Sequence, residues 1–171
     1  MRVVVICAAV VFVAFFVVFS VHAHTPLQLE VKEFLDSGVG ELPFSADANS
    51  HLRDVLALLS AARVVTALLV VALFALIPFL DAFSLRLAGS LLVFVPVGLS
   101  LVSWSWLFEV FHLVLFPQGN WRFPADSLLI QTYPQEFFVS FALWWGVLVV
   151  GSGLALVAGS YRLERCLHDF F

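Results

Sequence analysis

Four long runs of apolar residues, separated by more polar stretches, dominate the chain. They cover residues 3–21, 64–80, 87–107 and 137–159. Each run approaches or reaches the roughly 20 residues that a helix needs to cross the hydrocarbon core of a bilayer. The pattern predicts an all-α fold, a four-helix transmembrane bundle forming one integral membrane domain, residues 1–171. The more polar segments, about 22–63 and 108–136, would form a small module outside the membrane.

The first apolar run has two interpretations. Arg2, the run itself and the sequence Val21-His22-Ala23 resemble a secretory signal peptide with a small-x-small cleavage site. The run is longer than the apolar core of a usual signal peptide, which has about 7–15 residues. We expect the segment to be retained as a membrane anchor, followed by a solvated linker that contains His22 and His24.

The second helix is expected to begin before its apolar run. Ser45 and Asp47 suit a helix N-terminus, and no residue that breaks helices follows until Pro78. A helix over 47–80 would be roughly 50 Å long. Because the hydrocarbon core is roughly 30 Å thick, the first turns, which carry His51, should project beyond the membrane.

The third helix is expected to continue past Trp106 and to reach the same side of the membrane. Its extension would carry Glu109 and His112. Pro96 and Gly98 lie inside the helix and predict a bend, because proline removes one backbone hydrogen bond.

The composition indicates that lipid surrounds much of this chain. Hydrophobic residues make up 63% and charged residues 12%, and the mean hydropathy is +1.07. Soluble domains have about 45–50% apolar and about 25% charged residues. The net charge of -4 argues against a nucleic-acid partner. Cys7 and Cys166 stand near opposite ends without a CxxC motif, which argues against a disulfide framework or a zinc ribbon.

Basic residues predict the orientation of the chain in the cell membrane. With a cytoplasmic N-terminus, three short cytoplasmic segments would hold Arg2, Arg86, Arg162 and Arg165. Two much longer outer segments would hold only Lys32, Arg53 and Arg122, while Arg63 would snorkel at the membrane margin. Since basic residues concentrate in cytoplasmic loops, both termini are expected in the cytoplasm and the polar module outside.

Two histidines in this outer module carry the candidate chemistry. His51 and Asp54, and likewise Glu109 and His112, are three residues apart and would share a helix face. A neighbouring carboxylate could orient each imidazole and raise its basicity. Histidine exchanges protons near neutral pH, so the pair could provide general acid and base groups.

Other interpretations of the two histidines remain open. Interfacial histidines often contact lipid headgroups or pack as satisfied side chains in a non-enzymatic membrane subunit. Two helices that each present an imidazole could also hold a haem for electron transfer. The sequence has no HExxH motif, Walker loop or thiolate set. We therefore expect no metal and no cofactor.

A series of short motifs points to a family. His-x-x-Asp-Val spans residues 51–55, Phe-His-x-x-x-Phe spans 111–116, Trp-x-Phe spans 121–123 and Pro-x-x-Phe-Phe spans 134–138. In this order, they resemble the lipoprotein intramolecular transacylases (Lit), small membrane proteins first grouped as a domain of unknown function. The resemblance covers about residues 44–160.

The resemblance implies four transmembrane helices and an extracytoplasmic active site. It implies that an acyl chain moves from the sn-2 ester of a lipoprotein's diacylglyceryl group to the amino group of the same N-terminal cysteine. The product would be a lyso-form lipoprotein, and the partners would be diacylated lipoproteins and membrane lipids. The two motif histidines, His51 and His112, would be the catalytic residues.

The candidate residues suit this chemistry. An α-amino group has a pKa of about 7.7–8.0, and it attacks an ester only as the neutral amine. A histidine with a pKa near 6.5 can accept the proton that the amine loses. Arg53, the Trp121 N–H or a backbone N–H could stabilise the tetrahedral oxyanion, with Asp54 and Glu109 as supporting carboxylates.

Overall fold

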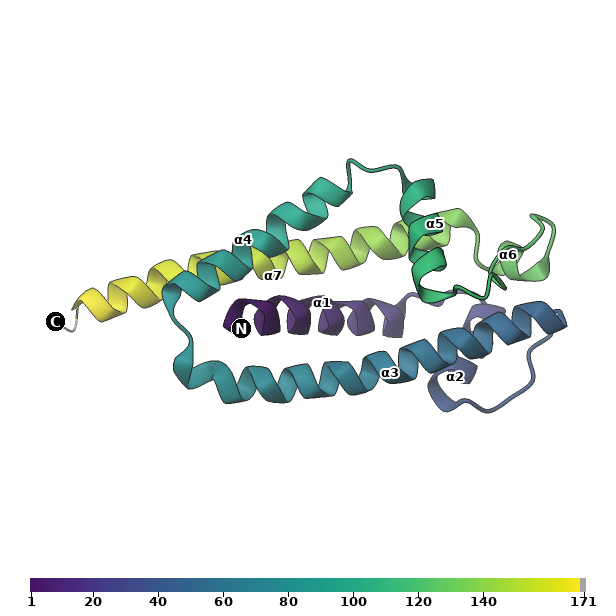
Figure 1. Ribbon diagram of the computed structural model, residues 1–171, viewed down its shortest axis with the longest axis horizontal. Coiled ribbons are helices and arrows are strands. Elements are labelled where there is room, and N and C mark those ends of the chain that lie inside the picture. Colours follow the sequence, from purple (N-terminus) through teal and green to yellow (C-terminus); the bar gives the residue numbers. More distant parts are fainter. Residues whose placement is uncertain (170–171) are drawn as a thin grey trace. The chain divides into compact units, whose positions relative to one another are not determined.

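The computed structural model describes residues 1–169, with side chains through residue 165, so the side chain of Cys166 lies outside them. All described regular elements are helical (Figure 1): α1 (Arg2–Val21), α2 (Pro26–Ser37), α3 (Ala46–Leu76), η1 (Ile77–Phe79), α4 (Ala82–Leu99), α5 (Trp104–Leu115), α6 (Leu128–Thr132) and α7 (Gln135–Asp169). Within the described residues, four helices are long and apolar enough to cross a membrane: α1, α3 with η1, α4 and α7. The predicted all-α membrane fold is confirmed.

Contacts divide the chain into two compact units. The first, here called the bundle unit, contains Met1–Val18, Val64–Leu101 and the chain from Leu143 onward. The second, here called the histidine unit, contains Phe19–Arg63 and Val102–Ala142. Helices α1, α3 and α7 each contribute residues to both units.

In the bundle unit, α1, α4 and α7 lie against one another (Figure 1). Gly89 of α4 faces Gly153 of α7 so closely that a Cβ on Gly89 would lie 2.5 Å from the Gly153 carbonyl oxygen. Small residues at helix interfaces let backbones approach in this way. Two turns earlier in α7, the Trp145 indole N–H donates to the Val11 carbonyl of α1, at 3.0 Å.

The α3 part of the bundle unit presents apolar side chains outward. Leu68, Val71 and Phe74 are each about two-thirds exposed. An apolar surface of this kind is costly in water, and hydrocarbon tails cover it at no such cost. The exposed faces therefore fit a lipid environment.

Ion pairs tie polar residues together at the ends of the bundle helices. The Arg2 guanidinium lies 2.5 Å from Asp81, and Asp81 also caps α4 by accepting from the Ser84 backbone N–H at 2.7 Å. Arg86 of α4 lies 2.6 Å from Glu164 of α7. These contacts pair α1 with the start of α4, and α4 with α7.

The expected extension of the third helix past Trp106 was wrong. Helix α4 ends at Leu99, and α5 starts separately at Trp104. Pro96 and Gly98 weaken the last turn, because proline lacks an N–H donor and glycine loses more conformational freedom in a helix. The Ser100 hydroxyl then donates to the Val97 carbonyl at 2.7 Å, which caps the released end.

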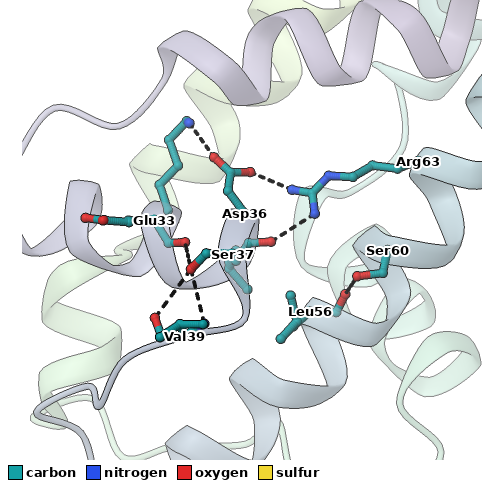
Figure 2. Close-up of polar contacts among 9 residues, drawn as sticks. Glu33, Asp36, Ser37, Val39, Leu56, Ser60 and Arg63 are labelled. Carbon is teal, nitrogen blue, oxygen red and sulfur yellow. Dashed lines mark hydrogen bonds and ion pairs between the residues drawn. The ribbon is translucent and has the colours of Figure 1, made fainter.

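Helix α2 was not predicted and is fixed by a polar contact with α3 (Figure 2). Its N-terminus is a capping box formed by Thr25 and Gln28. At its C-terminus, Arg63 of α3 donates to the Leu35 carbonyl at 3.0 Å and pairs with Asp36 at 2.5 Å. A cation suits this position because the last helical carbonyls lack partners. Arg63 thus binds the end of α2 instead of snorkelling freely.

The glycine contact between α4 and α7 predicts unequal effects of alanine. Gly89→Ala should lower the melting temperature of the purified protein by about 5 °C, since overpacking costs about 1–3 kcal/mol. Gly151→Ala is the matched control, because nothing lies within 4 Å of a Cβ there. Equal melting temperatures for the two variants would contradict the close helix contact.

Candidate active site

The first turns of α3 place His51 inside the histidine unit. The Ser45 hydroxyl accepts from the Ala48 backbone N–H at 3.3 Å, so α3 begins where its N-terminal signals predicted. His51 is only 8% exposed. His112, one turn before the end of α5, is also 8% exposed. Both side chains are therefore buried in the histidine unit, one on α3 and one on α5.

The structure brings the two imidazoles side by side. Their ring centroids are 6.1 Å apart with a tilt of 33°. Phe116 packs against both rings, at 4.7 Å from His51 and 5.7 Å from His112. Trp121 lies 4.8 Å from His112, and Phe123 lies 5.8 Å from His51. The result is a pair of buried imidazoles in an aromatic environment, which excludes water and strengthens electrostatic interactions.

A backbone contact fixes the tautomer of His112. Its Nδ1 lies 2.8 Å from the Phe108 carbonyl oxygen, which can only accept a hydrogen bond. Nδ1 therefore carries the proton, and Nε2 of the neutral ring keeps its lone pair. Burial lowers the pKa of His112, although the Phe108 carbonyl partly opposes the shift. His112 is accordingly neutral at pH 7, with Nε2 ready to accept a proton.

Asp54 belongs to the site, but its hydrogen bonds go to other partners than expected. Its Oδ2 accepts from the Asn120 side-chain amide at 2.6 Å and from Gln118 at 2.9 Å. The carboxylate thus holds the segment after α5, and Asn120 in turn lies beside the His51 ring. Asp54 acts on His51 through its charge and through Asn120. Sequence analysis did not single out Asn120 or Gln118; the available signal was that both lie within three residues of Trp121.

Glu109 and Arg53 lie away from the two imidazoles. Glu109 pairs with Arg122 at 3.0 Å, and both side chains are more than half exposed. The expected pairing of Glu109 with His112 is therefore wrong, because the Phe108 carbonyl occupies Nδ1. Arg53 is exposed and lines a separate cavity of about 250 Å³ with Asn49 and other residues. Two residues from His51 on a helix, it faces another side.

Three polar atoms of the site are buried and accept or donate no hydrogen bond within the described residues. They are His51 Nδ1, Asn120 Oδ1 and Trp121 Nε1. An unsatisfied buried polar group costs about 1–3 kcal/mol. Native proteins leave few such groups, and three of them lie around one histidine pair here. The His51 ring also lies within hydrogen-bonding reach of the Asn120 side chain.

His22 is another residue whose environment differs from expectation. It was predicted to lie in a solvated linker, yet it is 6% exposed. Its Nε2 lies 2.8 Å from the Ser140 hydroxyl and 3.3 Å from the Phe137 carbonyl of α7. The Phe137 ring packs against it at 4.9 Å. The contact anchors the chain after α1 to the start of α7, which no sequence pattern indicated.

The described residues contain no group of three or more His, Cys, Asp or Glu side chains arranged to hold a metal ion. The two imidazoles and their amide, indole and carboxylate neighbours can transfer protons and form hydrogen bonds.

Comparison with known proteins finds a matching family and similar solved structures. The family model described as "Lipoprotein intramolecular transacylase Lit" matches residues 20–138, well over half of the chain. The membrane-integral lipoprotein intramolecular transacylase Lit from Bacillus cereus aligns with a TM-score of 0.83 and 17% identity, over 98% of this chain and 94% of that one. A histidine-to-arginine variant of the Bacillus protein aligns with a TM-score of 0.69 and 17% identity, over 99% and 93%. No curated protein matches the sequence.

The fold and the site define a multi-pass integral membrane protein with a buried two-histidine centre. The family match makes the assignment specific. This chain belongs to the lipoprotein intramolecular transacylase (Lit) family. It is accordingly an acyltransferase of lipoprotein modification, and the alternative of a non-enzymatic subunit is wrong.

The buried environment of His112 predicts its titration. Because burial disfavours the imidazolium, the pKa of His112 should lie below the ordinary value of about 6.5, so more than half of the rings stay neutral as pH falls from 8 to 6.5. Nitrogen NMR of histidine-labelled protein should show this midpoint and an Nδ1-protonated neutral form. A His112→Gln sample assigns the signal. A midpoint above 6.5, or an Nε2-protonated ring, would contradict the assigned geometry.

Proposed function

We propose that this transacylase moves the sn-2 acyl chain of a diacylated lipoprotein to the amino group of its N-terminal cysteine, and that His51 and His112 carry the proton. The observation that carries the proposal is the buried imidazole pair, with its centroids 6.1 Å apart. Chemistry at neutral pH needs groups that exchange protons there, and a paired set of imidazoles supplies them.

The first step is attack by the amine. The amine nitrogen forms a bond to the ester carbon, and the carbonyl oxygen becomes an oxyanion. The nitrogen must lose a proton, and His112 Nε2 is the available acceptor because the Phe108 carbonyl holds the proton of this ring on Nδ1. The buried indole N–H of Trp121 is the candidate donor to the oxyanion.

The second step is departure of the glycerol oxygen. The bond between the ester carbon and this oxygen breaks, and the oxygen needs one proton to leave as an alcohol. His51 relays the proton that His112 received, accepting at one ring nitrogen and donating from the other. One proton has then moved from nitrogen to oxygen, both imidazoles are neutral again, and an amide has replaced an ester.

The enzyme's main contribution is orientation and exclusion of water. The amine and the ester belong to one lipoprotein, so holding them in the reactive geometry accelerates the attack of the amine on the ester. An aromatic surrounding keeps out water that would otherwise hydrolyse the ester. The conversion of an ester into an amide is favourable, so the reaction requires no nucleotide.

The reaction is tested by locating the acyl chain. Expression of the protein with a diacylated lipoprotein should give a product with one acyl on glycerol and one on the amino group. Total mass does not change, so fragmentation must place the acyl on nitrogen, and the N-terminus must become blocked to amine reagents. A free amine with an intact diacylglyceryl group, in cells that express the protein well, would refute the proposal.

The same assay should show that the two histidines act together. His51→Ala and His112→Ala should each lower the rate by about 10²–10⁴-fold, because each removes the proton path. The double variant should lose little more, since the effects of groups that act as one unit do not add. His24→Ala is a control, because His24 is exposed. Near-normal rates in either single variant would exclude a shared catalytic role.

We propose that the site faces the outside of the cell membrane, where lipoprotein N-termini lie, with both chain termini in the cytoplasm. The uneven density of basic residues supports this orientation. Reporter fusions after residues 40 and 125 should report an outside location, and a fusion after residue 171 a cytoplasmic one. A cytoplasmic signal from the residue 125 fusion would reverse the topology.

A further inference from the structure

The hydrogen bonds of Asp54 decide which way the Asn120 side chain points. Nitrogen and oxygen of an amide are alike in shape, so their assignment depends on the surroundings. A carboxylate only accepts, and Asp54 Oδ2 lies 2.6 Å from Asn120 Nδ2. Ser50 Oγ lies 3.5 Å from the same nitrogen. The amide nitrogen is therefore committed to Asp54, and Asn120 Oδ1 points the opposite way.

Asn120 Oδ1 is buried and makes no close hydrogen bond within the described residues, although the His51 ring lies within hydrogen-bonding reach of this side chain. An amide oxygen has lone pairs for two donors and no proton of its own, so it can only accept. The Asn120 side chain lies beside His51, which places this acceptor in the histidine site. The His51 ring can donate to one of these lone pairs, and the second is left for an N–H or O–H group of a ligand.

The unsatisfied atoms of the site fall into two opposite kinds. Asn120 Oδ1 accepts only, Trp121 Nε1 donates only, and His51 Nδ1 can do either. A ligand that satisfies the amide oxygen and the indole N–H needs a donor and an acceptor close together. The two reacting groups of the substrate provide this combination: the amine brings N–H donors, and the ester carbonyl brings an acceptor.

We propose that Asn120 is the residue that binds the amino group of the substrate's N-terminal cysteine, with Asp54 as the residue that positions Asn120. This inference rests on the proposed function and adds a subsite to it. One N–H of the neutral amine donates to Asn120 Oδ1, a second is free for the imidazole, and the nitrogen lone pair is directed at the ester carbon. The Trp121 N–H then lies on the carbonyl oxygen.

The chemistry explains why a neutral amide suits this position. A carboxylate next to the amine would favour the ammonium form, which has no lone pair and cannot attack. An amide oxygen holds the amine without that penalty. The charged Asp54 carboxylate lies on the far side of the Asn120 amide, where it accepts hydrogen bonds from Asn120 and Gln118.

The test compares two ligands that cannot react. Both are lipopeptides with ether-linked alkyl chains on glycerol. One has an N-terminal cysteine with a free amine, and the other replaces that cysteine with 3-mercaptopropionate, which lacks the amine and adds no bulk. Binding to the full chain in nanodiscs should favour the free amine by about tenfold, the ratio expected for one hydrogen bond.

Variants separate an amine subsite from a structural role. Asn120→Leu should reduce the affinity ratio to about one, mainly by weakening the free-amine ligand. Gln118→Leu is the matched control, because it also removes one donor from Asp54 but leaves Asn120 Oδ1 in place, so the ratio should persist. Should Asn120→Leu fail to fold, Asp54→Asn preserves shape, releases the Asn120 amide and should lower the ratio.

Three outcomes would overturn the inference. These are equal affinities in the unsubstituted protein, an equal loss for both ligands in Asn120→Leu, and an unchanged ratio in every folded variant. Because neither ligand can transfer an acyl chain, the result does not depend on turnover. Failure of the proposed function would appear separately, as a free amine in the product assay.

Discussion

The requirement that buried polar atoms find hydrogen-bond partners governs much of this structure. A lipid environment offers no water to replace a missing partner, so each polar group in or near the apolar helices needs a local one. Asp81 caps α4, Arg63 binds the last carbonyls of α2, and His22 bonds to Ser140. These contacts fix the ends of apolar helices and of the more polar α2 against their neighbours. Against this background, His51 Nδ1, Asn120 Oδ1 and Trp121 Nε1 stand apart, because within the described residues they lack close hydrogen bonds and all belong to the histidine unit.

The site combines groups from segments that are far apart in sequence, and each segment has its own local reason for its position. His51 belongs to the start of a long helix whose apolar part continues into the bundle unit. His112 belongs to a short separate helix, and a backbone carbonyl of that same helix sets its tautomer. The segment after α5 is irregular, yet Asp54 fixes it through two side-chain amides. A loop held by a carboxylate can present an amide and an indole to the histidines with defined orientation, which a freely moving loop could not do.

Sequence analysis predicted the fold class and the histidine pair because both have strong periodic or positional signals. Runs of about 20 apolar residues follow from bilayer thickness, and the start of α3 has a capping serine in front of a helix without breakers. The break between α4 and α5 was missed because Pro96 and Gly98 predict either a bend or an end, and only the Ser100 contact decides between them. The partners of Asp54, Glu109 and His22 were also missed, since they depend on tertiary packing between segments up to 118 residues apart.

A further step follows from comparing the two carboxylates that sequence spacing had placed beside the histidines. Glu109 and His112 are three residues apart, as are His51 and Asp54, yet only Asp54 takes part in the site. The difference lies in whether Nδ1 of each imidazole already has a backbone hydrogen-bond partner. Phe108 O satisfies His112 Nδ1, so a carboxylate would have nothing to accept there, and Glu109 turns outward to Arg122. His51 Nδ1 has no such backbone partner, and the nearby Asp54 is taken up by amides. One imidazole is thus fixed in a single tautomer by a carbonyl of its own helix, whereas the surroundings of the other depend on Asn120, which Asp54 holds in place.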